Sequence, residues 1–320
     1  MHDPANCLPI RPEWIVPYPH ERMTTGMDRL PELAALTRRH STQGVAAADC
    51  PGMLLIGADA VTPAQQIVYE PMLCVILQGA KRTTLGALSY TYRAGDYLVA
   101  SADLPVSGQV LEAPYAAIGI PLDPVIIADL MLETGTPAAE TAPVRALAVN
   151  RMDKGLRDAV GRLIGLLDRP ADVPVMAPMI RREILWRLLA GDAGEMIRQI
   201  GSQDGRLARV QRVIRRLRER YAEPIRIADL ADLAGMSETS LHRHFKAATS
   251  MSPLQFLKQV RLQQARNLLL GQGRDVAGVG FAVGYDSPSQ FSREYSRQFG
   301  RPPGRDLDHL RREPAGAAVL

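Results

Sequence analysis

Histidine is scarce in this 320-residue chain, and none of its six histidines lies between residues 41 and 241. Catalytic divalent metals in proteins are usually held by clustered imidazoles together with a carboxylate. The sequence also has neither a Gly-x-Ser-x-Gly element nor a phosphate-cradling glycine loop. We therefore predict that the chain holds no metal and no cofactor, and that the part before residue 241 binds a molecule rather than transforming one.

Cysteine is also rare, with Cys7, Cys50 and Cys74 as the only three. An odd number without a Cys-x-x-Cys pair argues against a disulfide framework and fits a reducing compartment. Cys74, within MLCVILQG, is open to two interpretations. It could sense oxidants or electrophiles, or it could be a small buried hydrophobic residue, which is the commoner role of a single cysteine on a strand.

Long apolar runs are absent, because no stretch of eighteen apolar residues could span a bilayer. Hydrophobic residues make up 46% of the chain and charged residues 22%, as in globular proteins. The first residues contain five prolines and lack the basic region and apolar core of a signal peptide. We expect a disordered leader over 1–26, a cytoplasmic location and no membrane contact.

The net charge of +4 is distributed unevenly along the chain. Residues 206–312 contain 20 Lys and Arg against 10 Asp and Glu, whereas the rest contains 18 against 24. A basic C-terminal third on an acidic body predicts a module that binds a polyanion, although a solvated Arg-rich surface would give the same count.

The spacing of apolar residues divides the chain into differently structured parts. Short alternating runs separated by turn residues over 52–121 predict an antiparallel sandwich or small barrel, and a short amphipathic helix precedes it at 29–40. Helical periods follow at 154–168 and 176–189, which could pack on the barrel or form a dimer.

The basic third contains one unit twice. Leu241 and Phe291, and likewise Phe245 and Tyr295, lie 50 residues apart, while Gly235 and Gly284 lie 49 apart. Each unit reads as a short helix, a glycine-bearing turn and a second helix, which is the helix-turn-helix plan. A long helix over 253–270 joins the units and could hold the two second helices about one DNA turn, roughly 34 Å, apart.

The second helices carry few large apolar residues, so most of their surface is free for side chains that read DNA. Arg pairs with guanine, Gln with adenine, and Ser or Thr with base edges or phosphates. The predicted DNA-contacting residues are Thr239, Ser240, His242, Arg243 and Lys246 in the first unit, and Ser287, Ser289, Gln290, Ser292, Arg293 and Arg297 in the second.

Residues 221–307 resemble the AraC/XylS family of bacterial transcription regulators, most clearly in VAGVGFAVGYDSPSQFSREYSRQFGRPP. By this resemblance Thr239, His242 and Arg243 would contact bases, and Ser289, Gln290, Ser292 and Arg293 would do so in the second unit. Pro288 departs from the pattern, since that place is often polar. The segments EPMLCVILQGAKRTTLG, YRAGDYLVASADLPVSGQV and PMIRREILWRLLAGDAG resemble a subgroup with a cupin-like sensing domain.

The resemblance implies an α+β chain with a cupin-like N-terminal β-barrel, flanking helices and an all-α C-terminal domain with two helix-turn-helix units. The expected parts are the leader 1–26, a sensing domain 27–135, a helical linker and dimerisation region 136–205, a DNA-binding domain 206–312 and a tail 313–320.

We expect a homodimer that binds double-stranded promoter DNA under control of a small-molecule effector, with RNA polymerase as a partner if it activates. The polar residues that could contact the effector are Gln78, Lys81, Tyr90, Tyr92 and Tyr97, although a structural role is the commoner one for such residues in a barrel. The alternative is a cupin enzyme or small-molecule-binding protein with an appended DNA-targeting domain.

Overall fold

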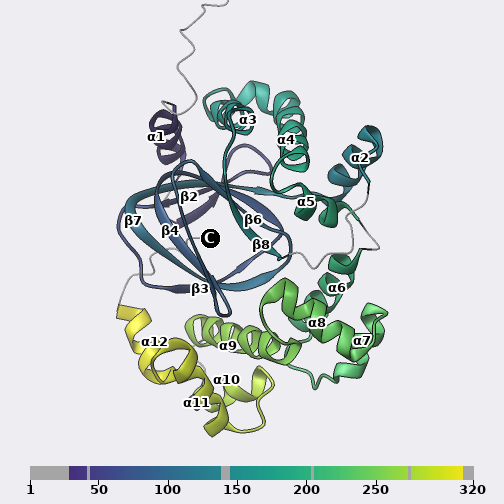
Figure 1. The fold of residues 1–320 in the computed structure, drawn as a ribbon. Coiled ribbons are helices and arrows are strands. Elements are labelled where there is room, and N and C mark those ends of the chain that lie inside the picture. The colour runs from purple at the N-terminus through teal and green to yellow at the C-terminus, as the bar shows by residue number, and fades with distance from the viewer. Residues whose placement is uncertain (1–28, 42–43, 138–144, 203–204, 273–274, 313–320) are drawn as a thin grey trace, which may run out of the picture.

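The protein consists of an antiparallel sheet flanked by helices, followed by an all-helical part (Figure 1). The structure, a computed structural model, describes residues 29–41, 44–137, 145–202, 205–272 and 275–312. The predicted leader, the tail and Cys7 lie outside these residues. The predicted α+β fold class, with a β-sheet domain before a helical domain with two helix-turn-helix units, is confirmed. None of the described helices combines the length and the apolar character needed to cross a bilayer.

Two long strands organise the sheet, and both have several partners. Among the described residues the sheet has eight strands in the order β1-β2-β7-β4-β6-β8, with β3 paired to β7 and β5 to β4. The strands are β1 (Gly44–Ala47), β2 (Leu54–Ala58), β3 (Gln65–Tyr69), β4 (Met72–Leu85), β5 (Leu88–Arg93), β6 (Asp96–Ala100), β7 (Leu104–Pro121) and β8 (Leu147–Arg151). β8 was not anticipated within the region expected to be helical, because five residues are too few to show a period.

One face of the sheet packs on a layer of helices. This layer contains α1 (Leu30–His40), α2 (Pro124–Thr134), α3 (Lys154–Gly165), α4 (Val173–Ala190) and α5 (Gly194–Gly201). Alternate residues of β4, Leu73, Val75 and Leu77, are buried in the same cluster as Leu163 of α3 and Ile184 of α4. Since successive strand residues point to opposite faces, Cys74 and Ile76 join the core of the other face.

That second core continues from the sheet into the helical part. It contains Cys74 and Leu98 from the sheet together with Val213 and Leu217 from α6 and Phe245 from α8. The helices of this part are α6 (Arg206–Glu219), α7 (Ile227–Ala234), α8 (Glu238–Thr249), α9 (Pro253–Gln272), α10 (Val276–Ala282), α11 (Pro288–Phe299) and α12 (Pro303–Arg312). The sheet and the first helix-turn-helix unit are therefore packed as one body (Figure 1).

Candidate functional site

Helices α7 and α8 form the first helix-turn-helix unit. Gly235 ends α7 with φ +60°, the left-handed conformation that glycine adopts without strain. The Ser237 hydroxyl begins α8 by accepting the Ser240 backbone N–H at 3.3 Å. Leu241 and Phe245 are fully buried and turn one face of α8 inward. The opposite face is consequently held toward solvent.

Four of the five residues predicted to contact DNA lie on this outer face. Thr239, His242, Arg243 and Lys246 are exposed, whereas Ser240 is half-buried beside the cap. Arg243 lies 3.4 Å from the ring nitrogen of the buried His244, a long contact that leaves much of its guanidinium available.

Helices α10 and α11 repeat the arrangement. Gly284 ends the first helix with φ +90°, and the Ser287 hydroxyl caps α11 by accepting the Gln290 N–H at 3.4 Å. Phe291 and Tyr295 are buried beneath α11. Of the predicted residues, Ser289, Gln290, Arg293 and Arg297 are exposed, Ser292 is half-buried, and Ser287 belongs to the cap.

On the outer face of α11 the polar side chains make only long hydrogen bonds, whereas Glu294, on its half-buried side, makes short ones. Arg293 donates to the Ser289 carbonyl at 3.3 Å, and Gln290 donates to Glu294 at 3.4 Å. Glu294 also accepts from Lys258 at 2.9 Å and from the Tyr285 hydroxyl at 3.0 Å. Partial burial opposes its charge, but these hydrogen bonds lower the pKa of Glu294. This carboxylate therefore stays ionised and fixes α11 on α9.

Helix α9 connects the two units and sets their separation. Its 20 residues span about 30 Å. Phe256 on α9 packs edge-on against Phe245 of the first unit, with ring centroids 5.5 Å apart. Toward the other unit, Arg266 of α9 binds the buried Asp306 of α12 at 3.0 Å, and the Tyr295 hydroxyl of α11 donates to the same carboxylate at 2.8 Å. A helix of this length can place two reading helices at successive major grooves.

Three of the five residues predicted to bind an effector, Lys81, Tyr90 and Tyr92, lie together on β4 and β5. Lys81 and Tyr92 are fully buried, and Tyr90 is half-buried. The Tyr92 hydroxyl lies 2.6 Å from Thr83 and 3.2 Å from the Tyr69 hydroxyl. Burial raises the pKa of Tyr92 well above its ordinary value.

The other two predicted residues lie apart from this cluster. Tyr97 is buried in the core beneath the helical layer, where burial and then the charges of Asp192 and Asp153 raise its pKa to about 12. Gln78 lines a cavity beside α1. The predicted set is therefore divided among three places. Tyr69 and Thr83, which complete the buried hydroxyl cluster, were not predicted. The alternation of inward and outward residues along β3 and β4 would have pointed to them.

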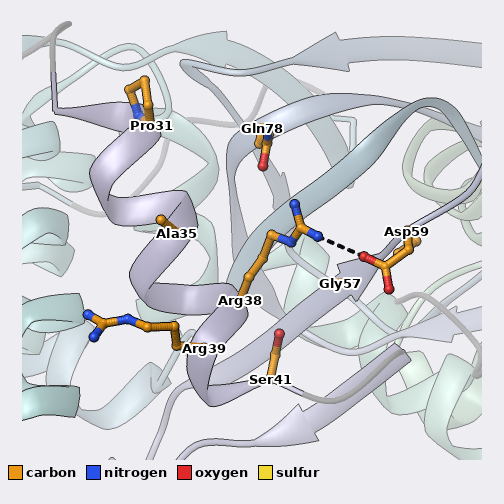
Figure 2. Close-up of a pocket in the computed structure, with 9 residues that line it drawn as sticks. Pro31, Ala35, Arg38, Arg39, Ser41, Gly57, Asp59 and Gln78 are labelled. Carbon is orange, nitrogen blue, oxygen red and sulfur yellow. Dashed lines mark hydrogen bonds and ion pairs between the residues drawn. The ribbon is translucent and has the colours of Figure 1, made fainter.

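The cavity beside α1 has a volume of about 510 Å³, within the range of small-molecule sites. It lies between α1 and strands β2 and β4 (Figure 2). The Arg38 side chain extends from α1 to Asp59, just beyond β2, and its guanidinium donates to that carboxylate at 2.8 Å. Gln78, on β4, completes a lining of polar and small residues.

Both described cysteines are buried. Burial raises the pKa of Cys74 to about 11, although the Lys81 charge and a hydrogen bond with Tyr115 act in the opposite direction. A thiol in this environment has little thiolate to offer an oxidant. Within the described ranges, no group of three or more His, Cys, Asp or Glu side chains could hold a metal ion.

Polar contacts join the sheet to the helical part in addition to the shared core. Gln211 of α6 donates to the Ser101 carbonyl, and Arg218 of α6 forms an ion pair with Asp103 at 2.5 Å. Gln263 of α9 donates to the Gln66 carbonyl of β3 at 2.9 Å. The helix that carries both reading units is thus in direct contact with the sheet.

Two family models match the chain. A model described as an AraC-type transcriptional regulator N-terminus matches residues 49–196, and one described as a helix-turn-helix domain matches residues 230–308. The HTH-type transcriptional activator RhaS of Salmonella schwarzengrund is 27% identical over 160 residues, which cover 49% of this chain and 56% of the relative. RhaS of Escherichia fergusonii is 29% identical over 155 residues, covering 48% and 55%. The chain spans about half the length of these curated relatives.

Two solved structures of ToxT from Vibrio cholerae share the fold over most of the chain. Apo ToxT has 10% identity and a TM-score of 0.53, covering 82% of this chain and 100% of its own. ToxT bound to an unsaturated fatty acid has 11% identity and a TM-score of 0.51, covering 84% and 96%. At these identities the likeness establishes the arrangement of the sheet and the helical part and nothing further.

Proposed function

Because the chain belongs to the AraC family of transcriptional regulators, we propose that it binds promoter DNA sequence-specifically and that a small molecule controls this binding. The supporting observation is the pair of outward faces on α8 and α11, whose units pack mainly on the first and the second half of α9. The effector would bind the N-terminal domain, whose relative in fold, ToxT, has been solved with an unsaturated fatty acid. The family is one of regulators and not of enzymes.

In this proposal α8 and α11 enter successive major grooves. Arg243 and Arg293 are the residues suited to guanine, Gln290 to adenine, and Lys246 and Arg297 to phosphates. Thr239, His242, Ser289 and Ser292 are further base contacts. Ser240, half-buried beside the first cap, and Ser287, whose hydroxyl caps α11, would contact DNA through a phosphate.

The test measures fluorescence anisotropy with the DNA upstream of the coding sequence and with a scrambled duplex, at fixed salt. Specific binding predicts an affinity about 10³-fold or more higher for the upstream DNA. Arg293→Ala should cost about 1–3 kcal/mol and relax the preference at one base pair. Arg93→Ala, at an exposed arginine of the sensing domain, is the charge-matched control. Equal affinity for both duplexes would contradict the proposal.

We further propose that the chain is divided into a sensing domain 27–135, a helical linker and dimerisation region 136–205 and a DNA-binding domain 206–312. In this division the protein is a homodimer formed through α4. Val175, Met179 and Trp186 are 66%, 61% and 40% exposed and share one face of α4. Apolar patches of this kind mark interfaces between proteins. Light scattering should show a dimer that Met179→Glu dissociates, while Val61→Glu, at an exposed loop valine, leaves it intact. A wild-type monomer would refute this part.

A promoter-binding regulator works where the DNA is, so we propose a cytoplasmic location. If the protein activates transcription, RNA polymerase would be a further partner. In vitro transcription from the bound promoter decides between activation and repression, since an activator raises transcript yield and a repressor lowers it.

A further inference from the structure

Arg38 and Gln78 are two planar hydrogen-bonding groups on opposite walls of the cavity beside α1 (Figure 2). Arg38 belongs to α1 and Gln78 to β4, so the site is built from segments far apart in the sequence. A guanidinium binds a planar carboxylate through two parallel hydrogen bonds, and a carboxamide can donate a further one through its NH₂ group.

The backbone around Gln78 is irregular in a way that aims its side chain. The pairing register of β4 with β7 shifts on both sides of Gln78. The next residue, Gly79, has φ +77°, and a Cβ there would lie 2.9 Å from the Pro114 carbonyl oxygen. A bulge of this kind redirects a strand residue, and it is common beside binding sites. Only glycine at position 79 permits it without strain.

Asp59 already shows how a carboxylate is held in this cavity. Its Oδ1 atom accepts from the Arg38 guanidinium at 2.8 Å, with the two side chains 40% and 59% exposed. Ion pairs as exposed as this one contribute little to stability, so an incoming carboxylate can replace Asp59 at small cost. The ion pair thus shows that the Arg38 guanidinium can hold a carboxylate in this cavity.

We propose that this cavity binds a small organic carboxylate, which displaces Asp59 from Arg38 and accepts a hydrogen bond from the Gln78 amide. The inference rests on the proposed control by an effector and names the chemical class of that effector. The volume of about 510 Å³ suits a compact ring or short chain behind the carboxylate.

The residue that is displaced leads directly to the contact with α9. Asp59 precedes β3 by a short segment, which is held by the Val110 N–H donating to the Thr62 hydroxyl at 3.0 Å. The Gln66 carbonyl of β3 accepts from Gln263 of α9 at 2.9 Å. Asp59 is therefore connected, through this short segment, to the strand that touches the helix joining the two helix-turn-helix units.

The test uses the full chain and a pair of probes of equal shape, cyclohexanecarboxylate and the neutral cyclohexanecarboxamide. Isothermal titration should show binding of the carboxylate at least about tenfold tighter than that of the amide, because a charge-assisted pair is lost with the amide. Arg38→Gln should weaken carboxylate binding by about tenfold or more. Asp59→Asn should tighten it by about two- to fivefold, since the competing carboxylate is gone. Arg169→Gln is the control and should leave the affinities for the carboxylate and for the amide unchanged.

Equal binding of the two probes, no binding of the carboxylate at millimolar concentration, or an unchanged affinity in Arg38→Gln would each overturn the site.

DNA affinity measured in the presence of the carboxylate tests whether the cavity is coupled to DNA binding. It should shift for the wild type but not for Gln263→Ala, which keeps carboxylate binding, and an unshifted wild type would overturn the coupling. Sequence-specific DNA binding without any probe is measured on the same samples, so failure of this site is distinguished from failure of the proposed function.

Discussion

The Asp306 carboxylate joins α9, α11 and α12 in the second helix-turn-helix unit, and its removal should lower the stability of that unit. It is 2% exposed, accepts from Arg266 at 3.0 and 3.4 Å, and accepts from the Tyr295 hydroxyl at 2.8 Å. Asp306→Ala leaves a mostly buried guanidinium and a buried phenol without their acceptor. Breaking a buried pair from one side costs about 3–5 kcal/mol.

Two features lower the expected value to about 3 kcal/mol, because the guanidinium keeps partial solvent access and its contact with the Phe299 ring. Hydrogen exchange of the α11 amides, together with urea unfolding, measures the loss. Asp308→Ala is the matched control, since Asp308 is exposed on the same helix. A loss below about 1 kcal/mol for Asp306→Ala would contradict this prediction, since an exposed ion pair contributes that much.

Four further residues, Gly284, Gly304, Glu294 and Cys74, each give a testable expectation. Gly284→Ala should destabilise the second unit by about 2–3 kcal/mol, because φ is +90° and the added Cβ would lie 2.5 Å from the Ala222 carbonyl. Gly304→Ala, a helical position with open space around it, should instead stabilise by about 0.5–1 kcal/mol, and thermal melts that rank the two variants in the reverse order would contradict this. The folded pKa of Glu294 lies below its ordinary value of 4.5, so the stability it contributes is present above that pH and is lost as the pH falls through the lowered pKa. Glu294→Gln should therefore flatten the acid limb of a stability–pH curve, and an unchanged limb would count against the assignment. Cys74, with a pKa of about 11, should remain unmodified by iodoacetamide at pH 8 in the native protein, because roughly one thiol in a thousand is ionised and the site is buried. Peptide mapping checks this, with urea-unfolded protein as the positive control, and fast native labelling of Cys74 would contradict it.

The helical part was predictable because its information is local and repeated. Leu241, Phe245, Phe291 and Tyr295 repeat at a fixed interval, and a helical period assigns them to one face. The residues of α8 and α11 outside that buried face are then expected to be exposed. What the repeat could not distinguish was a hydroxyl that caps a helix from one that is free to read DNA, as at Ser287.

The binding groups of the sheet were harder to predict because they depend on pairings between distant strands. Tyr90, Tyr92 and Tyr97 all read as strand tyrosines, yet Tyr97 packs under the helical layer while Tyr92 joins Tyr69 and Thr83. Gln78 leaves the regular alternation because of a bulge, which only the register with β7 reveals. Arg38 was not predicted at all, since its role depends on how α1 lies against the sheet.

The helical phase of the DNA site shows whether α8 and α11 bind the duplex together. In the proposed function the two helices enter adjacent major grooves on one face of the duplex, at a separation fixed by α9. Inserting five base pairs between the two footprinted half-sites turns one of them to the opposite face. We predict that this lowers the affinity at least about tenfold and that Arg293→Ala then has no further effect on the altered site, while inserting a full turn fails to restore binding because α9 cannot lengthen. Unchanged affinity after the five-base-pair insertion would contradict the claim that the two helices read the DNA together.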